Sequence, residues 1–369
     1  MKTRSRRFAL AIALLAAPLA AVDLVVTRYD DPAPDGCLAG DCSLREAVIE
    51  ADADPAPDRI LLSAGQYDLT RFGTDNASLA GDLDTNSEIE IVGPGATMTR
   101  IDASGLGLSA DNGAIEVHAG SHLTLRGSTL LGAALSGFRV AGGDLTVEEC
   151  EIRGSSSSFR SGIDAGGGGT VTVRNSAIVD NIYGLTATGV AVVLENVTLD
   201  GNALFQLAAL DTISFVCTHC TIVGAAGGDP ELRADGAVIE LGNSIVSGAC
   251  LLLNGGLIVS LGGNVESPGH GCDLSAGDLD DVADLGLSAL ADHGGPTRTF
   301  DLDVDSPAID LVLGADCLSR DQRGAARHKL ATIPCDAGAL ERAAGPPTPI
   351  FADGFEQGDD GAWVVPAGT

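Results

Sequence analysis

The 369-residue sequence contains almost no lysine and few aromatic residues. Its formal net charge is −30, and Lys329 is the single lysine beyond the N-terminal segment. Because a strongly acidic surface repels phosphate backbones and anionic lipid, we expect neither nucleic acid nor a membrane surface as a partner. One tryptophan and three tyrosines leave little material for the aromatic platforms that sugar clefts tend to use. The charge favours a soluble, monomeric protein.

Long apolar runs and several catalytic motifs are also missing. Beyond the N-terminus no stretch reaches the roughly 20 apolar residues of a membrane-spanning helix. The sequence has no nucleophile elbow, phosphate-binding loop or HExxH motif, so enzymes of those classes lack support. Residues 1–21 combine a basic start, an apolar run and two final alanines. This pattern predicts a secretory signal peptide, and we expect an exported protein.

A short phrase occurs six times between Leu123 and Val246. The copies are residues 125–130, 147–152, 173–178, 194–199, 217–222 and 241–246. Each copy has strand-like alternation of apolar and polar residues, and Gly-rich turns usually precede it. A fixed period of roughly 20–30 residues predicts a solenoid in which each coil buries its apolar edge against its neighbours. We therefore predict an all-β chain folded as a parallel β-helix.

Aligning the copies sorts other residues into columns that face outward or form turns. The outward columns are Arg126, Glu148, Arg174, Glu195 in the phrase and Glu116, Arg139, Asp164 in a preceding triplet. Successive rungs lie about 4.8 Å apart, so these alternating charges predict ladders of ion pairs. The column Asn175, Asn196, His219, Asn243 predicts a turn ladder, which makes His219 a turn residue rather than a ligand or base. Phe138, Phe205 and Phe215 fall at inward positions.

Nine cysteines in an exported chain predict disulfides. Three close pairs stand out: Cys37 with Cys42, Cys250 with Cys272, and Cys317 with Cys335. Cys150, Cys217 and Cys220 lie inside the repeat at inward positions, where free cysteine behaves as a small hydrophobic residue. A redox or zinc function for the CxxC of Cys217 and Cys220 is the alternative, but a structural zinc site needs further ligands that the sequence does not offer.

The chain divides into five segments. After the signal peptide, residues 22–87 contain a first strand, a loop and a helix over about 44–51, which begins at a capping box of Ser43 and Glu46. We expect this helix to cover the open end of the β-helix. Residues 88–275 are the coils, and residues 276–342 form an irregular C-terminal cap. Residues 343–369 are a Pro-rich linker and an acidic tail.

Two segments resemble known bacterial domains. Residues 42–47 (CSLREA) followed by 59–67 are similar to the CSLREA domain at the start of many exported β-helix proteins. Residues 290–341, with their GGPT, SPAID, DQRG and CDAGALE phrases, resemble the choice-of-anchor Q domain, although His328 replaces a usual proline and the phrase before Ser306 is acidic. The resemblance implies a right-handed parallel β-helix outside the cell or on its surface. It implies no activity and no catalytic residues.

Parallel β-helices include pectate lyases and polygalacturonases, so an enzyme is an open alternative. A lyase needs carboxylates beside a basic group, and a glycosidase needs converging carboxylates. The candidates in this sequence are Asp164, Asp180 and Asp200, with Arg153 or Arg160 as the basic group. In our alignment Asp180 and Asp200 are one position out of column, so they need not converge.

Calcium is the cofactor that the acidic stretches suggest. Alternate aspartates occur at Asp82 and Asp84, at 278–281, and at Asp301, Asp303 and Asp305. A calcium ion needs several converging oxygens, whereas alternate aspartates are usually a solvated strand face. No calcium-binding repeat or loop supports a site.

Our preferred hypothesis is a non-catalytic scaffold that contacts an extracellular glycan or a surface protein; the alternative is a polysaccharide lyase or glycoside hydrolase. The final segment, from Ile350, is similar to one that ends many exported proteins of some Gram-negative bacteria. We therefore expect secretion or display on the outer surface of such a cell.

Overall fold

The computed structural model describes residues 21–53, 55–107, 113–132, 136–155, 161–224, 231–275, 277–327 and 333–343. Almost all of the expected signal peptide, Arg160, His328 and the tail from Ile350 lie outside the described residues. Among the described residues, the helices are too short and too polar to span a membrane.

Two sheets contain all the strands. The 8-stranded sheet, which we call the front sheet, consists of β4 (Leu83–Thr85), β7 (Gly113–His118), β10 (Ser136–Ala141), β13 (Ser161–Gly166), β15 (Tyr183–Thr188), β17 (Phe205–Leu210), β20 (Leu232–Asp235) and β23 (Cys250–Leu253). The 17-stranded sheet consists of β1 (Asp23–Val25), β2 (Asp58–Leu61), β3 (Gly65–Asp68), β5 (Glu88–Val92), β6 (Thr99–Asp102), β8 (His122–Arg126), β9 (Thr129–Leu131), β11 (Asp144–Glu148), β12 (Glu151–Arg153), β14 (Thr170–Val179), β16 (Ala191–Asp200), β18 (Ser214–Thr218), β19 (Thr221–Val223), β21 (Val238–Gly242), β22 (Ile245–Ser247), β24 (Leu257–Gly262) and β25 (Val265–Ser267). The helices are α1 (Leu44–Asp52) and the single 3-10 turn η1 (Ser104–Leu106).

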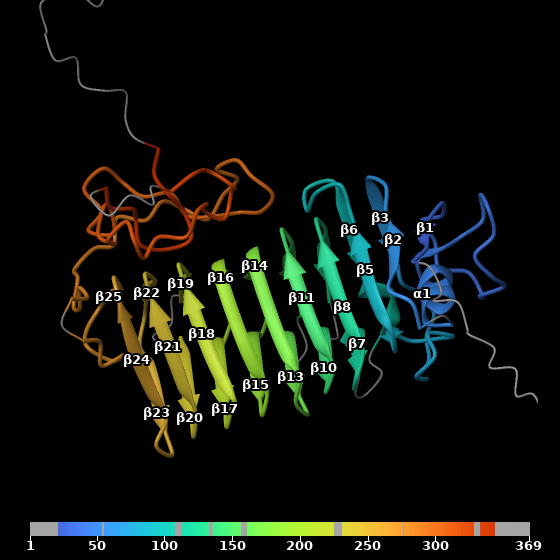
Figure 1. Cartoon of the computed structure of the whole chain (residues 1–369), viewed down its shortest axis with the longest axis horizontal. Coiled ribbons are helices and arrows are strands. Elements are labelled where there is room, and N and C mark those ends of the chain that lie inside the picture. The colour runs from blue at the N-terminus through green and yellow to red at the C-terminus, as the bar shows by residue number, and fades with distance from the viewer. Residues whose placement is uncertain are drawn as a thin grey trace, which may run out of the picture.

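The strands stack in parallel from coil to coil, so the predicted parallel β-helix is confirmed (Figure 1). The inward column runs in register through Leu125, Val147, Val173, Leu194, Cys217 and Leu241. All six side chains are fully buried. The ladder already begins at β1, which pairs with β2, so the segment before residue 88 belongs to the same body.

One corner of each coil is made by a single residue in the left-handed backbone region. Asn175, Asn196, His219 and Asn243 have φ values between 49° and 53° there, and Glu149 occupies the same place with φ 55°. Asparagine tolerates this conformation because its short side chain can hydrogen-bond locally. The turn column predicted from the sequence, including His219, is confirmed.

The helix α1 packs at the N-terminal end of the coils (Figure 1). Its capping box is formed as expected: the Ser43 side chain accepts from the Glu46 amide, and the Glu46 carboxylate accepts from the Ser43 amide at 2.8 Å. Arg45 is fully buried and donates to Asp31 at 2.6 Å and to the carbonyls of Ser78, Gly81 and Asp82. This arginine therefore fixes the loop at 78–82 against the helix.

The C-terminal cap, residues 277–327 and 333–343, is irregular and lies along the side of the coils rather than only at their end (Figure 1). It meets the corner column. Asn196 donates to the Arg320 carbonyl at 2.9 Å, and Thr198 donates to Gln322 at 2.6 Å. A second small core joins cap residues such as Leu302 and Val312 to Ile245 and Val265. The cap thus buries polar and apolar groups that the coils alone would expose.

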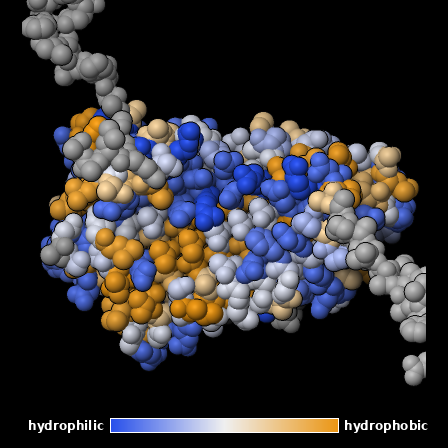
Figure 2. All heavy atoms as spheres, in the orientation of Figure 1, coloured by the Kyte–Doolittle hydropathy of each residue, from blue (hydrophilic) through white to orange (hydrophobic). Residues whose placement is uncertain are grey.

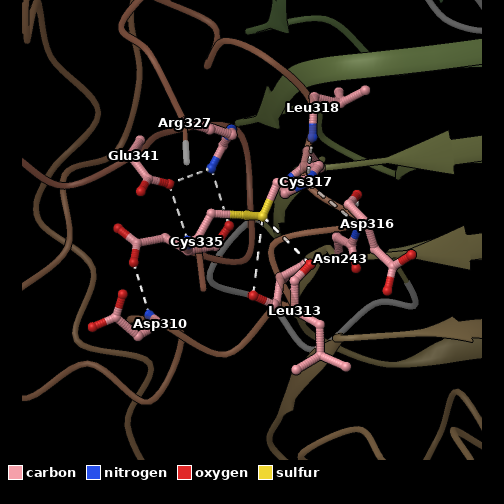
Figure 3. Close-up of a disulfide and its surroundings, with 12 residues drawn as sticks. Asn243, Asp310, Leu313, Asp316, Cys317, Leu318, Arg327, Cys335 and Glu341 are labelled. Carbon is pink, nitrogen blue, oxygen red and sulfur yellow. Dashed lines mark hydrogen bonds and ion pairs between the residues drawn. A yellow bond between two sulfur atoms is a disulfide. The ribbon is translucent and has the colours of Figure 1, made fainter. Parts of the chain in front are cut away.

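Within the cap, a buried ion pair lies beside the disulfide Cys317–Cys335 (Figure 3). Arg327 donates to the Glu341 carboxylate at 2.9 Å and to the Gly338 carbonyl at 2.7 Å. The Arg327 side chain is entirely buried. Bridges also join Cys37 with Cys42 and Cys250 with Cys272. With a fourth bridge between Cys217 and Cys220, the described residues contain four disulfides. This number fits a protein that matures outside the reducing cytoplasm.

Two sequence interpretations of inward residues need correction. Cys217 and Cys220 are buried as expected, but they are bonded to each other rather than free. Phe205 faces outward, not inward, because the next residue, Gln206, turns its side chain into the interior. There Gln206 bonds the backbone of Asn202 and the carboxylate of Glu231. Phe138 and Phe215 are inward and buried.

The outer surface of the 17-stranded sheet changes character along the solenoid. Towards the N-terminus the predicted charge ladder is formed, with Arg126–Glu148, Glu148–Arg174 and Arg174–Glu195 pairs. Over β18, β21 and β24 Figure 2 shows a hydrophobic area. Its exposed side chains include Val238, Leu257, Val259 and Leu261.

Candidate functional site

A pair of aromatic rings lies on the outer surface of the front sheet. Tyr183 and Phe205 come from neighbouring strands, β15 and β17, and are paired in register. Their ring centroids are 6.1 Å apart and their planes differ by 14°, so they are stacked. The guanidinium of Arg233, from the next strand, lies 5.9 Å from the Phe205 centroid. The three side chains form a half-exposed aromatic platform with a cation over it, which we call the platform.

A shallow depression surrounds the platform. It has a volume of about 200 Å³ and is lined by Ser161, Asp164, Tyr183, Thr186, Phe205, Ala208, Leu210 and Arg233. A second depression of about 320 Å³ follows at Arg139, Gly166 and Thr188, and the two share Asp164. Together they cross β10 to β20. Because strands are about 4.8 Å apart, this surface extends roughly 19 Å along the solenoid axis.

Asp164 is the one sequence candidate on this surface. It belongs to the predicted ladder, which is formed: Arg139 lies 3.5 Å from Asp164 and 3.6 Å from Glu116. Asp164 is thus held as a charged partner of Arg139 beside the platform. Its position suits hydrogen bonding to a hydroxylated ligand better than proton transfer.

The other candidates lie on a different side of the molecule, where the cap meets the coils. A groove of about 640 Å³ is lined there by residues that include Gln66, Arg100, Glu151, Arg153, Asp292 and Arg298. Arg298 of the cap makes a two-pronged pair with Glu151, with N–O distances of 3.0 and 2.9 Å. Burial lowers the pKa of Arg298, but the Glu151 hydrogen bond and charge outweigh it and leave that pKa raised.

Asp180 and Asp200 lie beside this groove on neighbouring coils. The amide of Asp180 donates to the Asp200 carbonyl at 3.1 Å, and the Asp180 carboxylate is 3.2 Å from Arg298. Burial, together with the Asp180 charge, raises the pKa of Asp200. The structure places these two aspartates on neighbouring coils, and Arg298 contacts the Asp180 carboxylate. The arginine comes from the cap, so no alignment of the coils could reveal it.

The acidic triplet proposed for calcium does not gather its carboxylates. Asp301, Asp303 and Asp305 form no group of three close ligand atoms, and the latter two are exposed. Across the described residues, one such group exists: Asp84, Glu116 and His118, whose ligand atoms all lie within 4.8 Å of one another. Sequence reasoning noticed Asp84 but missed His118. The sequence does contain a signal for this group: Glu116 and His118 are two residues apart on one strand, so their side chains point to the same face of the sheet.

Residues 113–271 match the family model described as the right-handed β-helix region. No match was found among curated proteins or among solved structures. The matched stretch contains β7 to β25, including the platform. Its ladders are parallel, with one register shift between β21 and β24. The fold and the family model agree: the chain folds as a parallel β-helix, and its residues 113–271 are similar to the right-handed β-helix family.

Proposed function

We propose that this protein is an exported, non-catalytic scaffold that binds an extended, uncharged glycan across the front sheet. The observation that carries the proposal is the stacked pair of Tyr183 and Phe205 beneath Arg233. Aromatic side chains bury large ligand area at low conformational cost, and a few polar groups around them fix orientation. Ser161, Asp164 and Thr186 supply those polar groups.

The shape and charge of the surface favour this class of ligand. A shallow depression that continues over several coils suits a chain of similar units better than a compact small molecule. The formal charge of −30 disfavours an anionic polysaccharide. The arginines on this surface are already engaged, since Arg139 pairs with Asp164 and Arg233 donates to Asp235 at 2.6 Å.

Binding without catalysis follows from how the nearby acids are used. Asp164 is paired with Arg139, and Glu151 in the other groove is paired with Arg298. Among the residues that line the depression around the platform, Asp164 is the one carboxylate.

A panel of neutral polysaccharides in affinity electrophoresis or calorimetry tests the proposal. Tyr183→Ala with Phe205→Ala should weaken binding at least about tenfold, since aromatic anchors dominate such contacts. Phe72→Ala is the matched control, because Phe72 is 72% exposed and distant in the fold. Retained affinity in the double variant, or binding of a purified surface protein at the platform in place of any glycan, contradicts the proposal.

A hydrolase or lyase is the second candidate, and the raised pKa of Asp200 on the coil next to Asp180 favours it. A carboxyl with a raised pKa beside a charged one can divide acid and base roles. The same polysaccharides should then yield new reducing or unsaturated ends, lost in Asp200→Asn. Unaltered polysaccharide after prolonged incubation supports the scaffold instead.

We also propose export to the outer surface of a Gram-negative cell, supported by the disulfides and by the N-terminal pattern. Surface proteolysis of intact cells, with detection of the protein before and after, tests this. Protection in intact cells but not in lysates places the protein inside and contradicts it.

A further inference from the structure

A trio of side chains at the N-terminal end of the front sheet is independent of the platform. Asp84 of β4 and Glu116 of β7 are partners in register, and His118 follows Glu116 by two residues on the same face. The His118 Nε2 atom lies 2.8 Å from Asp84 Oδ1. All three ligand atoms lie within 4.8 Å of one another. Two paired strands therefore hold one nitrogen and two carboxylate ligands in a fixed arrangement.

We propose that Asp84, Glu116 and His118 bind one divalent transition-metal ion, with zinc as the preferred ion. Imidazole nitrogen with carboxylate oxygen is an established donor set for zinc. Two ligand atoms at about 2.1 Å from a common ion lie up to roughly 4 Å apart, so small side-chain movements bring this trio into contact with the ion. Calcium is disfavoured, because it takes six to eight oxygen ligands.

The burial of the trio supports this assignment. The Asp84 side chain is fully buried, and the Glu116 and His118 side chains are 12% and 19% exposed. Two carboxylate oxygens and one imidazole nitrogen are thus held close together in a largely buried place. A bound dication would neutralise the negative charge gathered there. Asp84 Oδ2 also accepts from the Ser78 amide at 3.1 Å, which orients the ligand in the way that outer partners do in metal sites.

Arg139 is the competitor for this site. Its Nε atom is 3.6 Å from Glu116 on the side away from β4, and its other partner is Asp164. Removing this cation ends its competition with the metal for Glu116, so Arg139→Gln should bind the metal more tightly. A purely structural His118–Asp84 pair gives no reason for that gain.

Isothermal calorimetry of the full chain with zinc chloride tests the proposal, with manganese and calcium chloride as further arms. We expect one zinc per chain and weaker binding of the other two ions. His118→Gln should lower zinc affinity at least about 100-fold, because even outer partners contribute about 10–100-fold. Thermal unfolding without metal checks that each variant folds, and Glu116→Gln serves if His118→Gln does not.

His122→Ala is the matched control, since the His122 ring lies on β8 and bonds the hydroxyls of Thr124 and Thr146, away from the trio. Hydrogen exchange of residues 75–85 gives a second readout, because zinc should slow it in the wild type and not in His118→Gln. Absence of saturable zinc binding, equal affinity in His118→Gln, or tighter binding of calcium overturns the proposal.

Discussion

The corner column of the β-helix is open in its early coils and covered in its later ones. Glu149 and Asn175 are exposed or half-buried, whereas Asn196, His219 and Asn243 are buried beneath the cap. The backbone at all five positions is nearly the same, with φ between 49° and 55°. The repeat therefore sets the backbone conformation at these positions, and the cap determines whether each side chain is buried and what it contacts.

Under the cap the corner side chains change from making turns to holding a second layer. Asn243 donates to the Asp316 carbonyl at 3.0 Å. His219 donates from Nδ1 to the Gly338 carbonyl at 3.3 Å and accepts from the Leu318 amide at Nε2. Neighbouring coils are joined by continuous backbone ladders, whereas the cap is joined to the coils by side-chain bonds and by scattered backbone bonds such as that from Gly338 to Asn243. The two regions should thus respond differently to substitution.

The largest effect should come from the buried ion pair of the cap. Arg327→Met leaves the Glu341 carboxylate without its main partner, and such a loss costs about 3–5 kcal/mol of unfolding free energy. Urea denaturation followed by fluorescence or circular dichroism should show the cap unfolding before the coils. Arg320→Ala, at an exposed position, should change stability by no more than about 0.5 kcal/mol. Equal behaviour of the two variants would remove the distinction between cap and coils.

A core substitution in the coils should be slightly milder and should spread along the solenoid. Leu194 is fully buried, and Leu194→Ala should cost about 2–5 kcal/mol through lost transfer energy and a cavity. Because coils stabilise their neighbours, hydrogen exchange should quicken in the adjacent coils as well. Val193→Ala, on the outward side of the same strand, should cost clearly less. A strictly local change in exchange would argue against cooperative coils.

The covered corner predicts a pH dependence. Burial, together with the charge of Arg327, lowers the pKa of His219 to about 3. The unfolded chain therefore takes up a proton near pH 6.5 that the folded chain refuses, so stability is highest above pH 6.5 and falls towards pH 3. The slope from this group approaches about 1.4 kcal/mol per pH unit.

His219→Asn should remove that component while keeping the turn, because asparagine occupies the equivalent positions 196 and 243. Melting temperatures of both proteins between pH 4 and 7.5 measure it. The wild type should lose stability faster than the variant as the pH falls. Parallel curves would mean that His219 is protonated in the folded state.

The smallest effect should come from the open charge ladder. Arg174 contacts both Glu148 and Glu195, but its side chain is 40% exposed. Arg174→Ala should cost about 0.2–1 kcal/mol, and high salt should reduce the difference. Comparing denaturation at low and high ionic strength checks this. A salt-independent loss would indicate packing of the side-chain stem rather than charge.

The sequence predicted the coils well because their signal is periodic. The inward column, the turn asparagines and the charge ladders all follow from spacing, and each was found in register. Phe205 was misplaced because the sequence alignment of its coil was shifted by two residues. It set Phe205 beside Leu185, whereas in the structure Phe205 pairs with Tyr183 and Leu207 pairs with Leu185. Arg298 could not be assigned, since its contact with Glu151 joins residues 147 apart through an aperiodic segment. The cap groove depends on such contacts with an aperiodic segment, whereas the platform was missed because Phe205 was placed inward.

Cys150 gives the molecule a built-in reporter. It is the free cysteine of the described chain, entirely buried between coils, and burial raises the pKa of its thiol to about 12. A thiolate reagent therefore meets no reactive sulfur while the coils are closed. The rate at which a thiol reagent labels this cysteine therefore reports how often the central coils open, without an engineered cysteine.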